Sequence, residues 1–158
     1  MALFRKQSQK SGDLILDAII RLIYKVGFRA VIFLRRIGFP KKPGTAVVIW
    51  HDGQVLAVQH SYISGLGLPG GAIDAGESPQ EAAVREKREE LGLELDTNDL
   101  VPCGNLKNTE VFRIELTKMP EIHVDNREIV EAFFINPEDL IAKVSRYAEI
   151  LQAPGISR

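Results

Sequence analysis

The chain has 158 residues, 45% of them hydrophobic and 26% charged, which is typical of one soluble globular domain with a core of its own. Its single cysteine, Cys103, excludes an intrachain disulfide and fits a reducing compartment, so we expect a cytoplasmic protein. The net charge of −1 divides unevenly: residues 1–42 carry +8 and residues 43–158 carry −9. We therefore expect a basic N-terminal helical extension and linker over 1–42, followed by an acidic domain over 43–158. Such an asymmetry suggests an anionic surface as the partner of the extension.

A helix is predicted from Asp13 to about Ile37. Charged side chains recur there every four residues and draw one polar stripe on an otherwise apolar helix, at Asp17, Arg21, Lys25 and Arg29. The uninterrupted apolar runs are too short to span a bilayer. The pattern thus predicts an amphipathic helix ahead of the main domain.

Two interpretations of this helix stay open. It packs on its own domain or on a second copy of the chain, as a homodimer, because apolar helices are mostly buried. Alternatively it makes a peripheral membrane contact, in which the basic residues near its end meet lipid phosphates: Arg35, Arg36, Lys41 and Lys42. No specific nucleic-acid binding is expected, because these basic residues are not interleaved with aromatic ones.

The remaining elements alternate between strands and helices. Two apolar runs flank the dipeptide Asp52-Gly53, which predicts a β-hairpin. A long helix follows over 79–91, then strands near 99–103, 109–117 and 129–135, a short helical turn at "NPEDL", and a last helix over 140–152. This order indicates an α/β fold with layers of helices around a mixed sheet.

The bounds of the 79–91 helix are strongly marked. Ser78, Pro79 and Glu81 form a capping box with proline at the first helical position, and Gly92 is well placed to end the helix. A glycine-rich loop precedes it. Gly70 and Gly71 let the backbone approach a ligand closely or adopt a positive φ, so both are candidate substrate-binding residues.

Three glutamates share one side of this helix. At 100° per residue, Glu86, Glu89 and Glu90 fall within an arc of about 100°. Like charges four residues apart destabilise a bare helix, and a hard divalent cation such as Mg²⁺ would relieve the repulsion. The alternative is a solvated acidic face that Arg85 and Arg88 neutralise.

Together these residues resemble the signature of the Nudix hydrolases. The signature has nine specified positions, which fall here on Gly71, Glu77, Arg85, Glu86, Lys87, Glu89, Glu90, Gly92 and Leu93. Eight of the nine match. The departure is Lys87, where the family has an apolar residue. A lysine can bury its stem and send its ammonium outward. We expect Lys87 to lie off the arc of carboxylates and to leave the metal ligands intact.

The resemblance implies an α/β/α sandwich that hydrolyses a nucleoside diphosphate linked to another group, with Mg²⁺ or Mn²⁺ as cofactor. By matching position, the metal ligands would be Glu86, Glu89 and Glu90, with the carbonyl of Gly70 as a further ligand. One of these glutamates, or a glutamate of a later loop, would be the general base. The resemblance also implies a structural ion pair between Glu77 and Arg85.

Two further residues are candidates outside the signature. Glu128 follows the polar loop 118–127 and is preferred over Glu131 as the later-loop base. Tyr62 lies in the loop before the signature and is a candidate for substrate contact. The three histidines show no zinc-ligand spacing, so we expect them to be structural or on the surface. A weakly catalytic or non-catalytic Nudix-fold nucleotide-binding module is the alternative to an enzyme.

Overall fold

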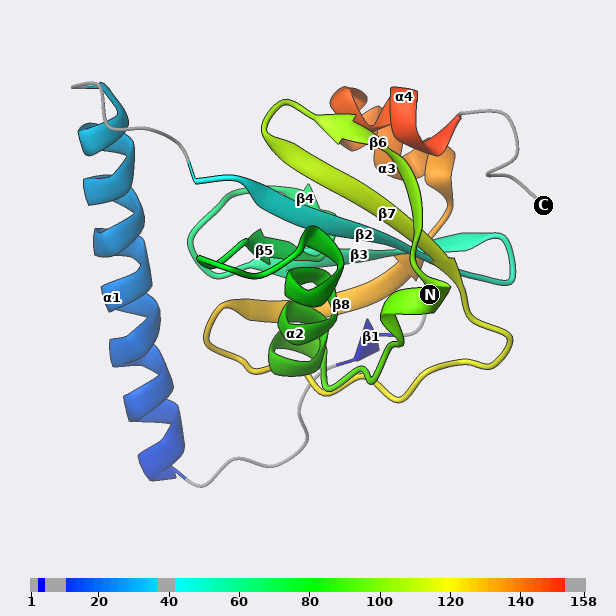
Figure 1. Cartoon of the computed structure of the whole chain (residues 1–158). Coiled ribbons are helices and arrows are strands. Elements are labelled where there is room, and N and C mark those ends of the chain that lie inside the picture. Colours follow the sequence, from blue (N-terminus) through cyan, green and yellow to red (C-terminus); the bar gives the residue numbers. More distant parts are fainter. Residues whose placement is uncertain (1–2, 5–10, 37–41, 153–158) are drawn as a thin grey trace.

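A mixed eight-stranded sheet forms the centre of the computed structural model, which describes residues 3–4, 11–36 and 42–152 (Figure 1). Its main path runs β1-β8-β3-β2-β7-β6, where the strands are β1 (Leu3–Phe4), β2 (Gly44–His51), β3 (Gln54–His60), β6 (Val101–Leu106), β7 (Thr109–Glu115) and β8 (Ile129–Ile135). The short strands β4 (Leu66–Gly67) and β5 (Gly70–Ala72) pair with β3 and β2. Strands β2 and β7 run parallel, and the other pairings between described strands are antiparallel.

Helices cover both faces of this sheet. Side chains alternate along β2, so that Val47 and Ile49 join one apolar core while Val48 and Trp50 join the other. The first core lies under α2, and the second under the C-terminal helical segments: α2 (Pro79–Leu91), α3 (Pro137–Lys143), η2 (Ser145–Tyr147) and α4 (Ala148–Leu151). The short η1 (Thr97–Asp99) links α2 to β6. The predicted α/β/α sandwich is confirmed.

The hairpin turn and both ends of α2 form where the local sequence predicts them. Asp52 and Gly53 adopt φ of 47° and 72°, which closes the hairpin between β2 and β3. Ser78 and Glu81 make both hydrogen bonds of the capping box at the start of α2. Gly92 ends the helix in the left-handed conformation, with φ of 66°. Helix α2 therefore has the predicted bounds, and its acidic residues have a fixed position.

The prediction of one last helix over 140–152 is wrong. The segment is divided into α3, η2 and α4, because Val144 leaves the helical region with φ of −141° and ψ of 79°. The break turns Tyr147 into the core, where its hydroxyl accepts a hydrogen bond from the backbone N–H of Leu68 at 3.2 Å. Tertiary packing outweighs helix periodicity here.

Helix α1 (Ser11–Arg36) is continuous through Gly27 and stands beside the sheet rather than over either face (Figure 1). The interpretation that its apolar side packs on its own domain is wrong. Asp17 of the polar stripe is buried, whereas the apolar residues Ile15, Leu22 and Ile23 are more than 60% exposed. In the described parts of the chain, no helix is long and apolar enough to cross a membrane.

Candidate active site

Arg85 fastens the loop before α2 to the helix. Its Nε and Nη2 atoms donate to the two carboxylate oxygens of Glu77 at 2.9 and 3.0 Å, and Nη2 also donates to the carbonyl of Ala72 at 3.1 Å. The hydrogen bonds from Arg85 hold the pKa of Glu77 below its usual value. A bidentate arginine fixes both the distance and the plane of its partner. The structure thus brings Glu77 and Arg85 into the contact expected from the sequence.

The two glycines of β5 are required by close packing rather than by a positive φ. A Cβ on Gly71 would overlap the carboxylate of Glu86, and one on Gly70 would lie 2.5 Å from the carbonyl oxygen of Thr45. Glu86 is held against the strand by Arg85, whose Nη1 donates to its Oε1 at 2.8 Å. The glycines therefore let an acidic side chain of α2 reach the backbone of β5.

A compact group of possible ligands lies next to this contact. One ligand atom from each of His60, Glu90 and Glu128 lies within 4.8 Å of the others. These residues come from β3, from α2 and from the turn just before β8. Glu90 is only 3% exposed. Its Oε1 and the Nδ1 of His60 are both buried and have no hydrogen-bond partner among the described residues. Buried polar atoms are rarely left unpaired, so these two atoms are available as ligands for a bound cation.

Burial sets the charge of this group. Burial, aided by the charges of Glu128 and Glu86, raises the pKa of Glu90 to about 7, although the nearby Lys87 lowers it. Burial lowers the pKa of His60 to about 4, an effect to which Lys87 also contributes. His60 is therefore a neutral imidazole at neutral pH, which is the form that ligates metals.

The expectation that Lys87 sends its ammonium outward is wrong, although the residue does lie outside the carboxylate arc on the helical wheel. Its side chain is fully buried, and its Nζ lies 2.6 Å from Oε2 of Glu90. Residues three apart on a helix differ by only about 60° in direction, so the long lysine side chain reaches Glu90 beneath the helix. The departure from the family pattern thus places a cation against one of the expected metal ligands.

Glu128 is positioned by a turn and by a phenol. The carboxylate of Asp125 accepts hydrogen bonds from the backbone N–H groups of Glu128, at 3.0 Å, and Ile129, at 2.9 Å. The hydroxyl of Tyr62 donates to Oε1 of Glu128 at 2.5 Å. Burial raises the pKa of Glu128, and it also raises the pKa of Tyr62, so the phenol stays protonated as a donor.

The structure separates the three glutamates of the predicted arc. Glu90 joins Glu128 and His60, while Glu86 lies under Gly71 but close enough for its charge to raise the pKa of both Glu90 and Glu128. The side chain of Glu89 is 58% exposed and its carboxylate lies 3.5 Å from Arg85. Glu90 and Glu128 therefore form the inner part of the site, and Glu86 and Glu89 its outer part.

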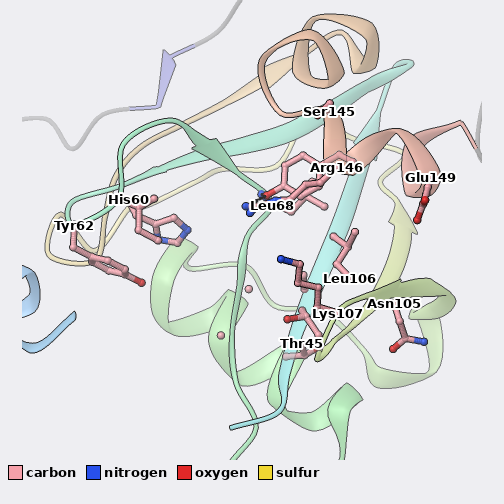
Figure 2. A pocket seen from close by; sticks show the side chains of 16 residues that line it. Thr45, His60, Tyr62, Leu68, Asn105, Leu106, Lys107, Ser145, Arg146 and Glu149 are labelled. Carbon is pink, nitrogen blue, oxygen red and sulfur yellow. Dashed lines mark hydrogen bonds between the residues drawn. The ribbon is translucent and has the colours of Figure 1, made fainter. Parts of the chain in front are cut away.

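A pocket of about 580 Å³ adjoins this group. Figure 2 shows His60 and Tyr62 at one end of it and Ser145, Arg146 and Glu149 at the other. Gly70 and Gly71 also line it, as do two residues of β2, the residue after β4, two residues of β6, the turn that follows and the first residue of β7: Thr45, Ala46, Leu68, Asn105, Leu106, Lys107 and Thr109. The glycine and tyrosine candidates for substrate contact thus border one pocket beside the acidic group.

The sequence does not mark His60, Asp125 and Arg146 as site residues. His60 shows no zinc-ligand spacing, which predicts a structural or surface role, and its two neighbours in the site lie on other elements far away in the sequence. Asp125 gives only a weak signal, since an aspartate a few residues before a strand often caps a turn. No sequence signal marks Arg146, which the break between α3 and α4 places at the pocket.

A family model described as the NUDIX domain matches residues 40–153. A MutT-like protein of Streptomyces ambofaciens is 35% identical over 63 residues, which are 40% of either chain. An RNA pyrophosphohydrolase of Pseudomonas putida is 33% identical over 63 residues, or 39% of this chain and 40% of that protein. The chain thus spans about 40% of the length of these curated relatives.

Solved structures share the fold. An Ap4A hydrolase of C. elegans superposes with a TM-score of 0.56 at 22% identity, over 65% of this chain and 86% of the other. A dihydroneopterin triphosphate pyrophosphohydrolase of E. coli superposes with a TM-score of 0.59 at 17% identity, over 72% of this chain and 97% of the other. At such identities the likeness concerns the fold alone.

Proposed function

The chain belongs to the Nudix family, and we propose that it is a metal-dependent hydrolase of a phosphoric anhydride bond in a nucleoside diphosphate linked to another group. One observation carries the proposal. A buried oxygen of Glu90 lies without a hydrogen-bond partner among the described residues, beside Glu128 and His60 and next to a pocket of about 580 Å³. Such an oxygen is costly unless a ligand binds it.

The donor set fits a divalent cation such as Mg²⁺ or Mn²⁺. Glu90 and His60 would hold it beside Glu128. Glu86, Glu89 and the carbonyl of Gly70 would be the further ligands that the family resemblance implies. When bound, such a cation supplies positive charge that offsets the phosphate charge and acidifies a water molecule. We place the reaction in the cytoplasm, in keeping with the single cysteine.

Glu128 is the residue best placed to take a proton from the attacking water. Its carboxylate is half-buried and its pKa is raised, which brings a general base closer to neutral pH. The hydrogen bond from Tyr62 fixes one of its oxygens and leaves the other for the water. Glu77 and Arg85 act at a distance, because they hold the loop that carries the two glycines.

The pocket would hold the group attached to the phosphates. Arg146 and Lys107 line it and supply positive charge that suits a phosphate or an acidic substituent. The backbone of Gly70 and Gly71 and the ring of Tyr62 would border the substrate where the pocket meets the acidic group.

The same geometry favours a second candidate function, a nucleotide-binding module with little catalysis. The ammonium of Lys87 lies 2.6 Å from one oxygen of Glu90 and neutralises a charge that a divalent cation would otherwise meet. If this pair excludes the metal, the pocket still binds a nucleotide but the water is not activated.

The test is a hydrolysis screen with Mg²⁺ and with Mn²⁺ on nucleotide sugars, dinucleoside polyphosphates and nucleoside triphosphates, together with calorimetric titration of metal and nucleotide. We expect the wild type to release phosphate products from at least one class, and Glu90→Gln and Glu128→Gln to lower kcat at least about 100-fold. Glu94→Gln, an exposed acid outside the site, is the matched control and should keep full activity. Equally poor hydrolysis by all four proteins with retained nucleotide binding would establish the module instead.

A further inference from the structure

The polar side of α1 is clamped to the loop that precedes Glu128. Arg21 donates from Nε to the carbonyl of Asn126 at 2.7 Å and from Nη2 to its Oδ1 at 3.0 Å. One turn earlier, the buried Asp17 lies 3.5 Å from Nε of Arg127. Charged groups that usually face water therefore face the domain here.

A second contact joins α1 to the site itself. The rings of Tyr24 and Tyr62 stack with centroids 6.1 Å apart and an angle of 24° between their planes. Tyr62 is the residue whose hydroxyl donates to Glu128. The helix thus touches both structures that position Glu128, and these contacts fix which of its sides faces away from the domain.

The side that faces away is apolar. Six large aliphatic side chains on it are 51–65% exposed: Ile15, Leu16, Ile19, Leu22, Ile23 and Val26. At 100° per residue they occupy an arc of about 120°. A surface helix of a soluble domain shows the reverse arrangement, with the apolar arc toward the core. An apolar patch of this kind marks an interaction site.

Charge selects the occupant of this face. Residues 1–42 carry ten Lys or Arg against two Asp, a net charge of +8. Two copies joined through their α1 faces would bring two such segments together, and like charges repel. An anionic lipid surface attracts the same segment and accepts the aliphatic side chains among its acyl chains.

We propose that α1 binds in the interface of an anionic membrane through its aliphatic face, while its polar face stays clamped to the catalytic domain. The helix lies in the plane of the membrane, and the site with Glu128 works beside the lipid surface. The lipid binding itself does not depend on the proposed hydrolysis, since it follows from the exposed face and the charge of α1.

The experiment is sedimentation of the full chain with vesicles of phosphatidylcholine alone and of phosphatidylcholine mixed with phosphatidylglycerol, at low and high salt. We expect binding to the mixed vesicles, weaker binding at high salt, and little binding to pure phosphatidylcholine. Ile19→Asp should weaken binding at least about tenfold, because it removes an aliphatic group that the membrane would bury and adds a negative charge. Met119→Asp is the matched control and should bind like the wild type, since Met119 is 50% exposed, as Ile19 is 51% exposed, but lies on the domain.

Circular dichroism melts of both variants check that they fold. Equal binding by wild type and Ile19→Asp, or no binding to anionic vesicles, would overturn the proposal. A dimeric solution mass that becomes monomeric in Ile19→Asp would assign the face to a second copy instead. If the wild type sediments with anionic vesicles but hydrolyses none of the nucleotides, the result counts against the proposed enzyme and not against the membrane contact.

Discussion

Replacing Lys87 by methionine isolates the buried charge of Glu90. Methionine is unbranched and of similar length, so Lys87→Met keeps most of the packing beneath α2 and removes the ammonium. Glu90, 3% exposed, then loses the donor that lies 2.6 Å from its Oε2, and its other oxygen already has no hydrogen-bond partner among the described residues. A buried carboxylate without its partner destabilises the folded state whenever it is ionised.

The sign of the pH dependence follows from the pKa of Glu90. In the wild type it is raised from 4.5 to about 7, so the folded state keeps a proton that the unfolded state loses. The free energy of unfolding therefore falls as pH rises from 4.5 to 7, by about 1.4 kcal/mol per unit and about 3 kcal/mol in total. Lys87 lowers this pKa. In Lys87→Met the pKa is higher, and the fall continues above pH 7.

These values set the size of the effect. At pH 5.5 Glu90 is protonated in both folded proteins, and the variant loses one hydrogen bond, about 1 kcal/mol. Above pH 7 the free energy of unfolding of the wild type no longer falls. That of the variant keeps falling by about 1.4 kcal/mol per pH unit, which gives up to about 2 kcal/mol between pH 7 and pH 8.5. We expect the variant to be less stable than wild type by about 1 kcal/mol at pH 5.5 and about 3 kcal/mol at pH 8.5.

Urea unfolding at both pH values, with a chelator to remove metal, measures this difference. The double variant Lys87→Met/Glu90→Leu removes both charges, and at pH 8.5 it should be as stable as wild type or more stable by about 1–4 kcal/mol. A destabilisation by Lys87→Met that is the same at both pH values would show that Glu90 carries no buried charge. A stable Lys87→Met variant at pH 8.5 would show that the pair does not form in solution.

Two further variants test the glycine contact and the phenol. Gly71→Ala should lower the free energy of unfolding in urea by about 1–3 kcal/mol and lower kcat at least about tenfold, because its Cβ displaces Glu86. The Cβ of the control variant Gly27→Ala meets nothing within 4 Å, so this variant should be more stable than wild type by up to about 1 kcal/mol. Equal stability of the two variants would contradict the contact between Gly71 and Glu86. Tyr62→Phe should raise the pKa of Glu128, since the hydrogen bond from Tyr62 lowers it, and so move the acidic limb of the pH–kcat profile to higher pH. An unchanged limb would remove Glu128 from the role of base.

Elements with local signals could be predicted from the sequence. The capping box at Ser78 and the glycine at Gly92 fix both ends of α2 through contacts within a few residues. The Asp52-Gly53 hairpin closes in the same way. The predicted C-terminal helix is different. Val144 breaks the helix, and the break lets Tyr147 pack in the core against the sheet. This packing is not visible in the local sequence.

The candidate site could be predicted only in part for the same reason. The glutamates of α2 form a pattern along one helix and are visible in the sequence. His60 and Glu128 join Glu90 only after β3 and β8 have paired, with a register shift between Gln59 and His60. The orientation of Lys87 depends on the sheet that buries it. A wheel of α2 alone shows that Lys87 and Glu90 are neighbours but not that both lie inside.

Burial of the acidic group destabilises its charged form and also strengthens its attraction for a cation. An exposed glutamate such as Glu89 binds a cation only weakly, because water screens its charge. The buried Glu90 would hold a cation more strongly, and an ion bound to it would offset the cost of its desolvation. Lys87 donates to one of the two oxygens of Glu90 and leaves the other without a hydrogen-bond partner among the described residues. The lysine thus offsets part of the desolvation cost of Glu90, while one carboxylate oxygen remains available inside the site.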